Sequence, residues 1–265
     1  MNAAGENPSR TPKRRFILLG ASNVARGIAS AVAAADAVWN QPLDLLAAFG
    51  HGRSYGLPSM VLGRTLPGIV QCQLWNDLDA RTALPTSAIV TDVGNDLLYG
   101  ASPEKISAWV KNSFERFSRH HAAIAVSGIP LASLAKLRPW EFRFFRTILY
   151  PNSRLTFATA LTSAGELDER LRALAKEFGA RFVEPETAWY GGDRIHIRRA
   201  AERLAWRQLL APLAMESLGE IPPAPLRRFL YLRALTPYQR WVFGIPNGRA
   251  QPSGRLPNGT VVSLY

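Results

Sequence analysis

The chain has 265 residues, a single cysteine and a formal net charge of +12, from 32 basic and 20 acidic side chains. This length allows one domain with a large core of its own. The lone Cys72 excludes a disulfide framework or a thiolate metal cluster within the chain, and it favours a reducing, cytoplasmic location. No apolar run approaches the roughly 18 residues that a membrane-spanning helix needs.

Residues 1–12 show no apolar periodicity, so we expect a disordered N-terminal arm. After it, short apolar runs alternate with longer amphipathic segments. The runs predict strands at 15–20, 43–50, 68–75, 87–93, 122–129 and 180–184. The intervening segments predict helices at 24–39, 103–120, 131–150 with a break at Pro139, 166–178 and 198–218.

Most of the predicted strands are apolar throughout rather than alternating, which is typical of strands buried on both faces. Their alternation with helices indicates an α/β domain over 13–220, with a parallel sheet covered on both faces. Right-handed connections then place the loops that follow the strands along one edge of the sheet. Open α/β sheets bind their ligands at that edge.

The segment 221–265 is rich in proline, glycine and arginine, and it predicts an extended C-terminal arm. Its middle part, LRRFLYLRALTPYQRWVF, interleaves arginines with aromatic residues. We expect this arm to pack against the domain, and the alternative is peripheral contact with a membrane or a partner. Nucleic-acid binding is not favoured, because the chain has no motif that reads RNA or DNA.

The first predicted strand runs into GASN, which places Gly20, Ser22 and Asn23 where a helix begins. Serine and asparagine are preferred helix caps, so Ser22 is either a cap or a nucleophile at a helix N-terminus. The sequence GASNVARG lacks the glycine spacing of a dinucleotide-binding turn. The chain also contains neither a phosphate loop nor a G-x-S-x-G elbow.

Two later strands end in turns that suit a site. The second strand runs into FGHGRSYG, where Gly50 and Gly52 allow a tight turn with backbone N–H groups at the sheet edge. The strand at 87–93 ends in VGND, where Asn95 and Asp96 suit either turn formation or catalysis. We interpret Asp92, just before them, as a structural carboxylate.

Near the end of the domain, DRIH places Asp193 three residues before His196. This spacing lets a carboxylate orient an imidazole, as a histidine base requires, and a surface ion pair gives the same pattern. Ser22, Gly50 and Asn95 each follow a predicted strand, and the DRIH block follows the last one. Their common placement at one sheet edge favours a catalytic site over unrelated caps.

The blocks GASN, FGHGRSYG, VGND and DRIH resemble the SGNH hydrolase superfamily, also called GDSL esterases and lipases, and they occur in the family's order. The resemblance covers about residues 16–218 and implies a three-layer α/β/α sandwich of the flavodoxin-like type. Ala21 stands where the family usually has aspartate, and Val93 stands where it has glycine. The chain therefore resembles a divergent member.

The resemblance implies a serine hydrolase that cleaves a carboxylic ester or thioester. It makes Ser22 the nucleophile, His196 the general base and Asp193 its orienting partner. It also implies an oxyanion hole that is formed by the N–H groups of Ser22 and Gly50 and the side-chain amide of Asn95. No metal or organic cofactor is expected. The alternatives are an acyltransferase with the same triad and a noncatalytic protein that binds an anionic partner or a membrane through its basic tail.

The expected partner is a small-molecule ester or acyl compound. We expect its binding to involve His51, from the glycine-rich loop, together with Trp140 and Phe144. These aromatics belong to KLRPWEFRFFRTILYP, at residues 136–151. That segment either lines an acyl or aryl pocket, covers it as a lid, or forms a buried helix pair.

Overall fold

The computed structural model describes residues 11–149, 155–214 and 218–265. The expected disordered arm at 1–12 therefore falls almost entirely outside the described residues, and so does Tyr150 at the end of the aromatic segment. In the described part of the chain, no helix combines the length and the apolar character that crossing a membrane requires.

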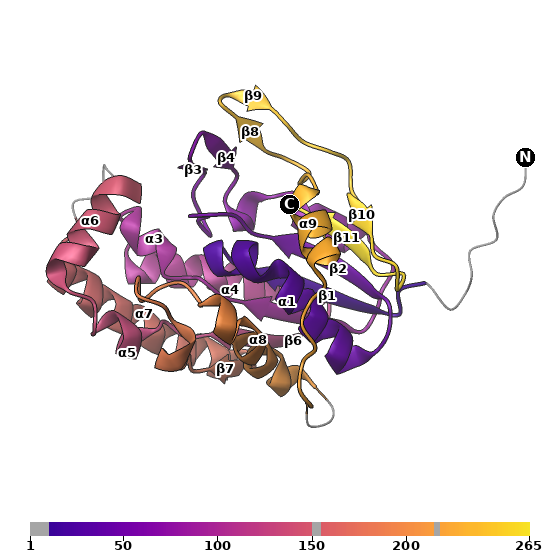
Figure 1. Cartoon of the computed structure of the whole chain (residues 1–265), viewed down its shortest axis with the longest axis horizontal. Helices are drawn as coiled ribbons and strands as arrows, with labels where there is room; N and C mark the ends of the chain where they lie inside the picture. Colours follow the sequence, from indigo (N-terminus) through magenta and orange to yellow (C-terminus); the bar gives the residue numbers. More distant parts are fainter. Residues whose placement is uncertain (1–10, 150–154, 215–217) are drawn as a thin grey trace, which may run out of the picture.

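A seven-stranded sheet forms the centre of the molecule (Figure 1), in the order β10-β11-β2-β1-β5-β6-β7. All neighbouring strands are parallel except β10 and β11. From β2 to β7 this is the 2-1-3-4-5 order of flavodoxin-like sheets, in which the winding reverses between β1 and β5. The strands are β1 (Arg14–Leu19), β2 (Leu43–Ala48), β5 (Thr86–Val90), β6 (Ala123–Ser127), β7 (Arg181–Val183), β10 (Gly254–Arg255) and β11 (Val261–Leu264).

Helices cover both faces of this sheet, and the predicted three-layer α/β/α sandwich is confirmed. Alternate residues of β1 point to opposite faces. Phe16 joins a core with α1, α8 and α9, whereas Ile17 joins a core with α2, α4 and α7. The helices are α1 (Ser22–Trp39), α2 (Leu74–Ala80), α3 (Asn95–Leu98), α4 (Pro103–Arg119), α5 (Leu131–Leu134), α6 (Pro139–Leu149), α7 (Phe157–Glu177), α8 (Glu202–Leu210) and α9 (Leu226–Ala234), with 3-10 helices at Ile69–Gln71, Thr187–Trp189, Arg199–Ala201 and Ala211–Leu213.

The predicted strand at 68–75 is wrong. These residues form the 3-10 helix Ile69–Gln71 and the first residues of α2. Ile69 donates its N–H to the carbonyl of Ser54, in the glycine-rich loop, instead of pairing with a strand. The apolar side chains of the run are buried against the sheet, and this burial produces an apolar pattern without any strand pairing.

Two predicted helices have different bounds in the structure. α7 begins at Phe157 rather than at 166, because Thr156 caps it by accepting a hydrogen bond from the N–H of Thr159 at 3.2 Å. Of the described residues in the helix predicted at 198–218, only Glu202–Leu210 is α-helical, so the helix begins later than predicted.

The C-terminal segment is part of the central sheet, so a boundary at residue 220 does not separate an arm from the fold. β11 pairs in parallel with β2. Upstream, α9 packs against α1, where the Arg228 guanidinium lies 2.8 Å from the Asp36 carboxylate. The segment expected as an extended arm therefore supplies two strands and a helix of the sandwich itself.

A small second sheet joins two hairpins that are distant in the sequence. β3 (Ser59–Val61) and β4 (Arg64–Leu66) form one hairpin, and β8 (Trp241–Val242) and β9 (Ile245–Pro246) form the other. The hairpins pair antiparallel through β4 and β8. In Figure 1 they extend together away from the central sheet.

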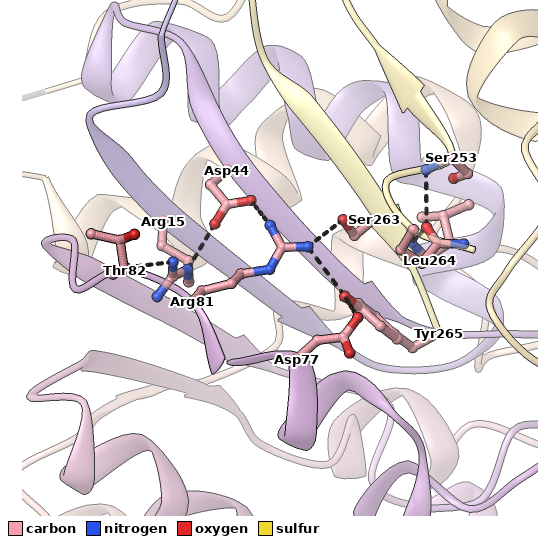
Figure 2. Close-up of polar contacts among 10 residues, drawn as sticks. Arg15, Asp44, Asp77, Arg81, Thr82, Ser253, Ser263, Leu264 and Tyr265 are labelled. Carbon is pink, nitrogen blue, oxygen red and sulfur yellow. Dashed lines mark hydrogen bonds and ion pairs between the residues drawn. The ribbon is translucent and has the colours of Figure 1, made fainter. Parts of the chain in front are cut away.

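A buried ion-pair network holds the C-terminal strand to the sheet (Figure 2). Asp44 of β2 accepts a hydrogen bond from Nε of Arg15 on β1 at 2.8 Å, and its other oxygen pairs with Arg81. Arg81 also donates to Oγ of Ser263, on β11, at 2.8 Å. Because Arg15 is only 2% exposed, its buried charge depends on the Asp44 carboxylate for neutralisation.

Asp44→Ala is expected to lower the free energy of unfolding by about 3–5 kcal/mol, because the Arg15 charge then stays buried beside an empty site. Chemical denaturation followed by tryptophan fluorescence measures this change. The control is Glu177→Ala, which removes an exposed ion pair with Lys111 and is expected to cost about 1 kcal/mol or less. A loss for Asp44→Ala as small as that of the control would contradict this role of the network.

Candidate active site

Three loops at the carboxyl edge of the sheet meet where its winding reverses. α1 begins at Ser22, shortly after β1, and α3 begins at Asn95, shortly after β5. The loop that follows β7 carries Asp193 and His196. Since β1 and β5 flank the reversal, this is the place where open α/β sheets bind ligands. The fold brings Ser22 and His196 into contact although they are 174 positions apart in the sequence.

Ser22, His196 and Asp193 form a continuous hydrogen-bonded chain. Nε2 of His196 lies 3.0 Å from Oγ of Ser22, and Nδ1 of the same ring lies 2.7 Å from Oδ2 of Asp193. A proton on Nδ1, facing the carboxylate, leaves Nε2 free to accept the serine proton. The side chains of His196 and Asp193 are 19% and 28% exposed, so a small molecule has access to them.

The Asp193 carboxylate is held by its own loop. Its Oδ1 accepts hydrogen bonds from the backbone N–H groups of Ile195 at 3.3 Å and His196 at 3.0 Å. Partial burial raises the pKa of this carboxyl, but the hydrogen bonds from the ring and backbone of His196 outweigh it, and the net pKa is lowered. Asp193 therefore stays ionised near neutral pH and keeps the ring oriented.

The start of α1 is capped by a distant carboxylate rather than by Ser22. Oδ2 of Asp92 accepts hydrogen bonds from the N–H groups of Ala21 at 2.8 Å and Asn23 at 3.0 Å. Ser22 is the first residue of the helix, and its hydroxyl is directed at His196. Of the two interpretations of Ser22, the capping one does not apply, because Asp92 fills that role as a structural carboxylate.

Asn23 connects the start of α1 with the histidine loop. Its Nδ2 donates to Oδ1 of Asp92 at 2.7 Å and to the carbonyl of Ile195 at 3.1 Å, while its Oδ1 accepts from the N–H of Ile197 at 2.8 Å. The residues on both sides of His196 are thereby fixed to α1. In the sequence Asn23 is only part of a helix start, because a lone asparagine gives no sign of a partner 172 positions away.

A second carboxylate, Asp96, joins the glycine-rich loop to α3. It is fully buried and accepts hydrogen bonds from the hydroxyl of Ser54 and from the N–H of Tyr55 at 3.0 Å. Desolvation raises the pKa of Asp96 to about 6, although these hydrogen bonds act in the opposite direction. The contact fixes the neighbouring Asn95 relative to the glycine-rich loop.

The side chain of Asn95 has an unused donor. Its Nδ2 is buried and has no hydrogen-bond partner among the residues that the structure describes, which is rare for a buried polar atom. The N–H of Ser22 belongs to the first turn of α1, where backbone donors have no acceptor within the helix. Ser22 and Asn95 line the same cavity, as do His51 and Gly52, whereas Gly50 is not among the described lining residues.

This cavity has a volume of about 290 Å³. Its walls are mostly apolar and include Leu97, Leu134, Leu137, Phe142, Phe157 and Leu161. Two of the predicted substrate residues, Trp140 and Phe144, lie outside the described lining and are 63% and 56% exposed. Phe142 faces the cavity instead, because residues two positions apart on a helix point in different directions.

His51, the third predicted substrate residue, lies at the cavity and close to the imidazole of His196. Partial burial lowers the pKa of the His51 imidazole, and repulsion from charge on His196 lowers it further. Three cations act on it in the same direction, namely Arg26, Arg64 and Arg233. His51 is therefore neutral at neutral pH, and positive charge gathers around the cavity.

The raised pKa of Asp96 predicts a pH-dependent stability that Asp96→Asn removes. Between the ordinary value of 3.8 and about 6, the folded state binds more protons than the unfolded state, so stability falls as pH rises through this window. The size is on the order of 3 kcal/mol, at about 1.4 kcal/mol per pKa unit.

Denaturation of the wild type and of Asp96→Asn at a series of pH values measures this effect. The other carboxyl groups contribute equally to the pH dependence of both proteins, so their contributions cancel in the difference. We expect the free energy of unfolding of Asp96→Asn to rise relative to the wild type as pH increases from about 4 to about 7. A difference that does not change with pH would show that the Asp96 carboxyl titrates normally.

No protein-family model and no curated protein matches the chain. Among solved structures, it is similar to the inhibitor-bound aryl esterase of M. smegmatis, with 16% identity over 75% of this chain and 98% of that one and a TM-score of 0.52. TesA is similar at 15% identity over 75% and 99% of the two chains, with a TM-score of 0.49. AlinE4, an SGNH-hydrolase family esterase, has 19% identity over 65% and 77%, with a TM-score of 0.41.

At these identities the similarity concerns the fold and not the activity. The aryl esterase matches over nearly its whole length and over three quarters of this chain. The chain therefore shares its α/β/α fold with this solved esterase, at low sequence identity.

Proposed function

We propose that this chain is a serine hydrolase that cleaves small carboxylic esters or thioesters. One observation carries the proposal: Ser22, His196 and Asp193 are aligned at 3.0 and 2.7 Å beside an apolar cavity. A nucleophile, a base and an orienting acid in this order are what activates a serine hydroxyl. The sequence blocks and the shared fold support the same assignment.

In the first half of the reaction, His196 accepts the proton of the Ser22 hydroxyl while Oγ attacks the carbonyl carbon. Asp193 stabilises the imidazolium that forms and keeps the ring in place. His196 then gives the proton to the leaving alcohol or thiol. In the second half, a water molecule activated in the same way hydrolyses the acyl-enzyme. The cycle uses no metal or organic cofactor.

Negative charge on the tetrahedral intermediate is stabilised by hydrogen-bond donors around Ser22. We assign this role to Nδ2 of Asn95 and to the N–H of Ser22, with the N–H of Gly50 as a third donor. The unpaired Nδ2 supports the assignment, because a buried donor without a partner costs about 1–3 kcal/mol unless a ligand uses it. The positive end of α1 adds a favourable potential at Ser22.

The cavity indicates the class of substrate. Its volume of about 290 Å³ is at the lower end of the range for small-ligand sites, and its apolar walls suit a short acyl or aryl group. We place the reaction in the cytoplasm, since the single cysteine favours a reducing compartment.

Fluorophosphonate labelling tests the nucleophile. We expect covalent modification at Ser22, located by mass spectrometry, and none in Ser22→Ala. Asn95→Ala is expected to fold normally and to hydrolyse aryl esters about 100- to 1,000-fold more slowly, because it lacks one oxyanion donor. Asn76→Ala, at an exposed position of α2, is the matched control and is expected to keep full activity.

The same assays distinguish the alternatives. A folded wild-type protein that is not labelled would reject the nucleophile and leave a noncatalytic binding protein. Transfer of the acyl group to an added alcohol or sugar, in place of release as the free acid, would identify an acyltransferase.

Ala160→Phe tests whether the cavity binds the acyl group. Ala160 lies on α7 and lines the cavity, so a phenyl ring there occupies space that a longer chain needs. We expect kcat/KM for longer acyl esters to fall by about 10- to 200-fold, while acetyl esters are hydrolysed at nearly the wild-type rate. A panel of aryl and thio esters of increasing chain length measures this preference. Ala158→Phe, exposed on the same helix, is the control, and an equal loss at every chain length would contradict acyl binding in this cavity.

A further inference from the structure

The two hairpins of the second sheet expose large apolar side chains. Leu62 and Phe243, at the two turns, are 88% and 81% exposed. Met60 and Ile245, one on each hairpin, are both 69% exposed. We call these four residues the apolar tip. Single exposed apolar residues are common on protein surfaces, but a group of four on neighbouring turns is not.

The apolar tip is one surface, although its two halves come from opposite ends of the sequence. β4 and β8 pair, and the N–H of Phe243 donates to the carbonyl of Gly63 at 2.7 Å. The Phe243 ring covers Gly63 so closely that an added Cβ there would lie 2.4 Å from a ring atom. The two turns are therefore in direct contact, and both hairpins extend in the same direction (Figure 1).

Both turns contain a residue type that their backbone disfavours. Leu62 has a φ of 51° and Phe243 has a φ of 48°, and a glycine with positive φ follows each of them. Two-residue turns of this kind prefer Asn-Gly or Asp-Gly, because bulky side chains are strained in the left-handed region. A leucine and a phenylalanine at these positions are therefore unfavourable for two reasons: the backbone is strained, and a large apolar side chain is exposed to water. Strain that persists in this way is typical of functional sites.

Positive charge surrounds the apolar tip. Arg64 directly follows the first turn, and Arg240 directly precedes β8 and lies near enough to Arg64 to feel its charge. Arg64 also acts on His51, together with Arg26 and Arg233. These four arginines therefore place positive charge next to the apolar tip and next to His51 at the cavity.

The apolar tip is continuous with the mouth of the catalytic cavity. Val61 and Leu62 belong to the first hairpin and line the cavity, on which the Ser22 hydroxyl also opens. A surface that contacts the apolar tip therefore lies at the entrance through which a substrate reaches Ser22.

We propose that the apolar tip inserts into an anionic lipid surface, with the four arginines at the level of the headgroups. Exposed apolar side chains bordered by cations are what peripheral membrane contacts use. An acidic protein would pair with the arginines but would give the apolar tip no apolar partner. The contact then delivers esters from the lipid to the cavity, a step that rests on the proposed function.

Vesicle co-sedimentation tests this contact, with Ser22→Ala as the parent protein so that hydrolysis cannot alter the lipid. We expect the parent to bind vesicles of phosphatidylcholine mixed with phosphatidylglycerol, to bind more weakly as salt is added, and to bind phosphatidylcholine alone poorly. Adding Phe243→Asn and Ile245→Thr is expected to weaken binding at least about tenfold. Thermal unfolding checks that this variant folds. We expect it to fold, because Phe243→Asn gives the turn the Asn-Gly pair that such turns prefer.

Leu226→Asn is the matched control, because Leu226 is 70% exposed on α9, which packs on the part of α1 near Asp36. It is expected to bind vesicles like the parent. The proposal is overturned if the parent does not bind anionic vesicles, or if the double change weakens binding no more than the control does. Binding to polyglutamate but not to vesicles would also overturn it and assign the surface to an acidic protein. Because the parent lacks the nucleophile, none of these outcomes depends on the proposed hydrolase activity.

Discussion

The contact between Ser22 and His196 depends on the hydrogen bonds of two neighbouring side chains, Asp92 and Asn23. Asp92 caps α1 from the adjacent strand end, and the Ser22 hydroxyl is thereby left for His196. Asn23 extends the same contact to the backbone around His196. Hydrogen bonds to a charged carboxylate are worth about 1.5–3 kcal/mol each, more than those between neutral groups. The backbone of Asp92 has a φ of 59°, a conformation that aspartate tolerates better than most residues.

The C-terminal strand supports the site as well as the sheet. β11 pairs with β2, and β2 leads directly into the glycine-rich loop. Arg53 in that loop is completely buried and donates hydrogen bonds to the carbonyls of Phe49, Pro67 and Tyr265. The loop is therefore tied to the last strand as well as to Asp96. Removal of the segment after residue 220 would take away an internal strand of the sheet, and it would disturb the loop that carries Gly50.

The sequence predicts the sandwich and the proximity of Ser22 to His196 because both leave local signals. Strands buried on both faces are apolar along their length, and the site residues follow strand ends, so the fold class and the grouping of Ser22 with His196 are accessible without coordinates. Features that depend on partners far away in the sequence could not be predicted from it. The apolar run at 68–75 has the composition of a strand, but the N–H groups of Ile69 and Val70 pair with the glycine-rich loop. The short β11 has no neighbour in the sequence that indicates where it pairs.

In the aromatic segment at residues 136–151, too, the sequence predicts a helix but not the contacts of its side chains. Pro139 indicates where α6 begins, but the sequence does not determine which face of α6 meets the cavity. That face is set by packing against α7, and it turns Phe142 inwards while Trp140 and Phe144 are exposed. The capping of α1 by Asp92 is a further example, because serine and asparagine at a helix start normally suggest a local cap.

Asn23 places His196 against Ser22, and a double-mutant cycle on the rate of fluorophosphonate labelling checks this positioning. Asn23→Ala, His196→Ala and the double variant are compared with the wild type after thermal unfolding has shown that each is folded. We predict that Asn23→Ala slows labelling of Ser22 when His196 is present and has no further effect when His196 is absent. Equal slowing by Asn23→Ala in both backgrounds would contradict the claim.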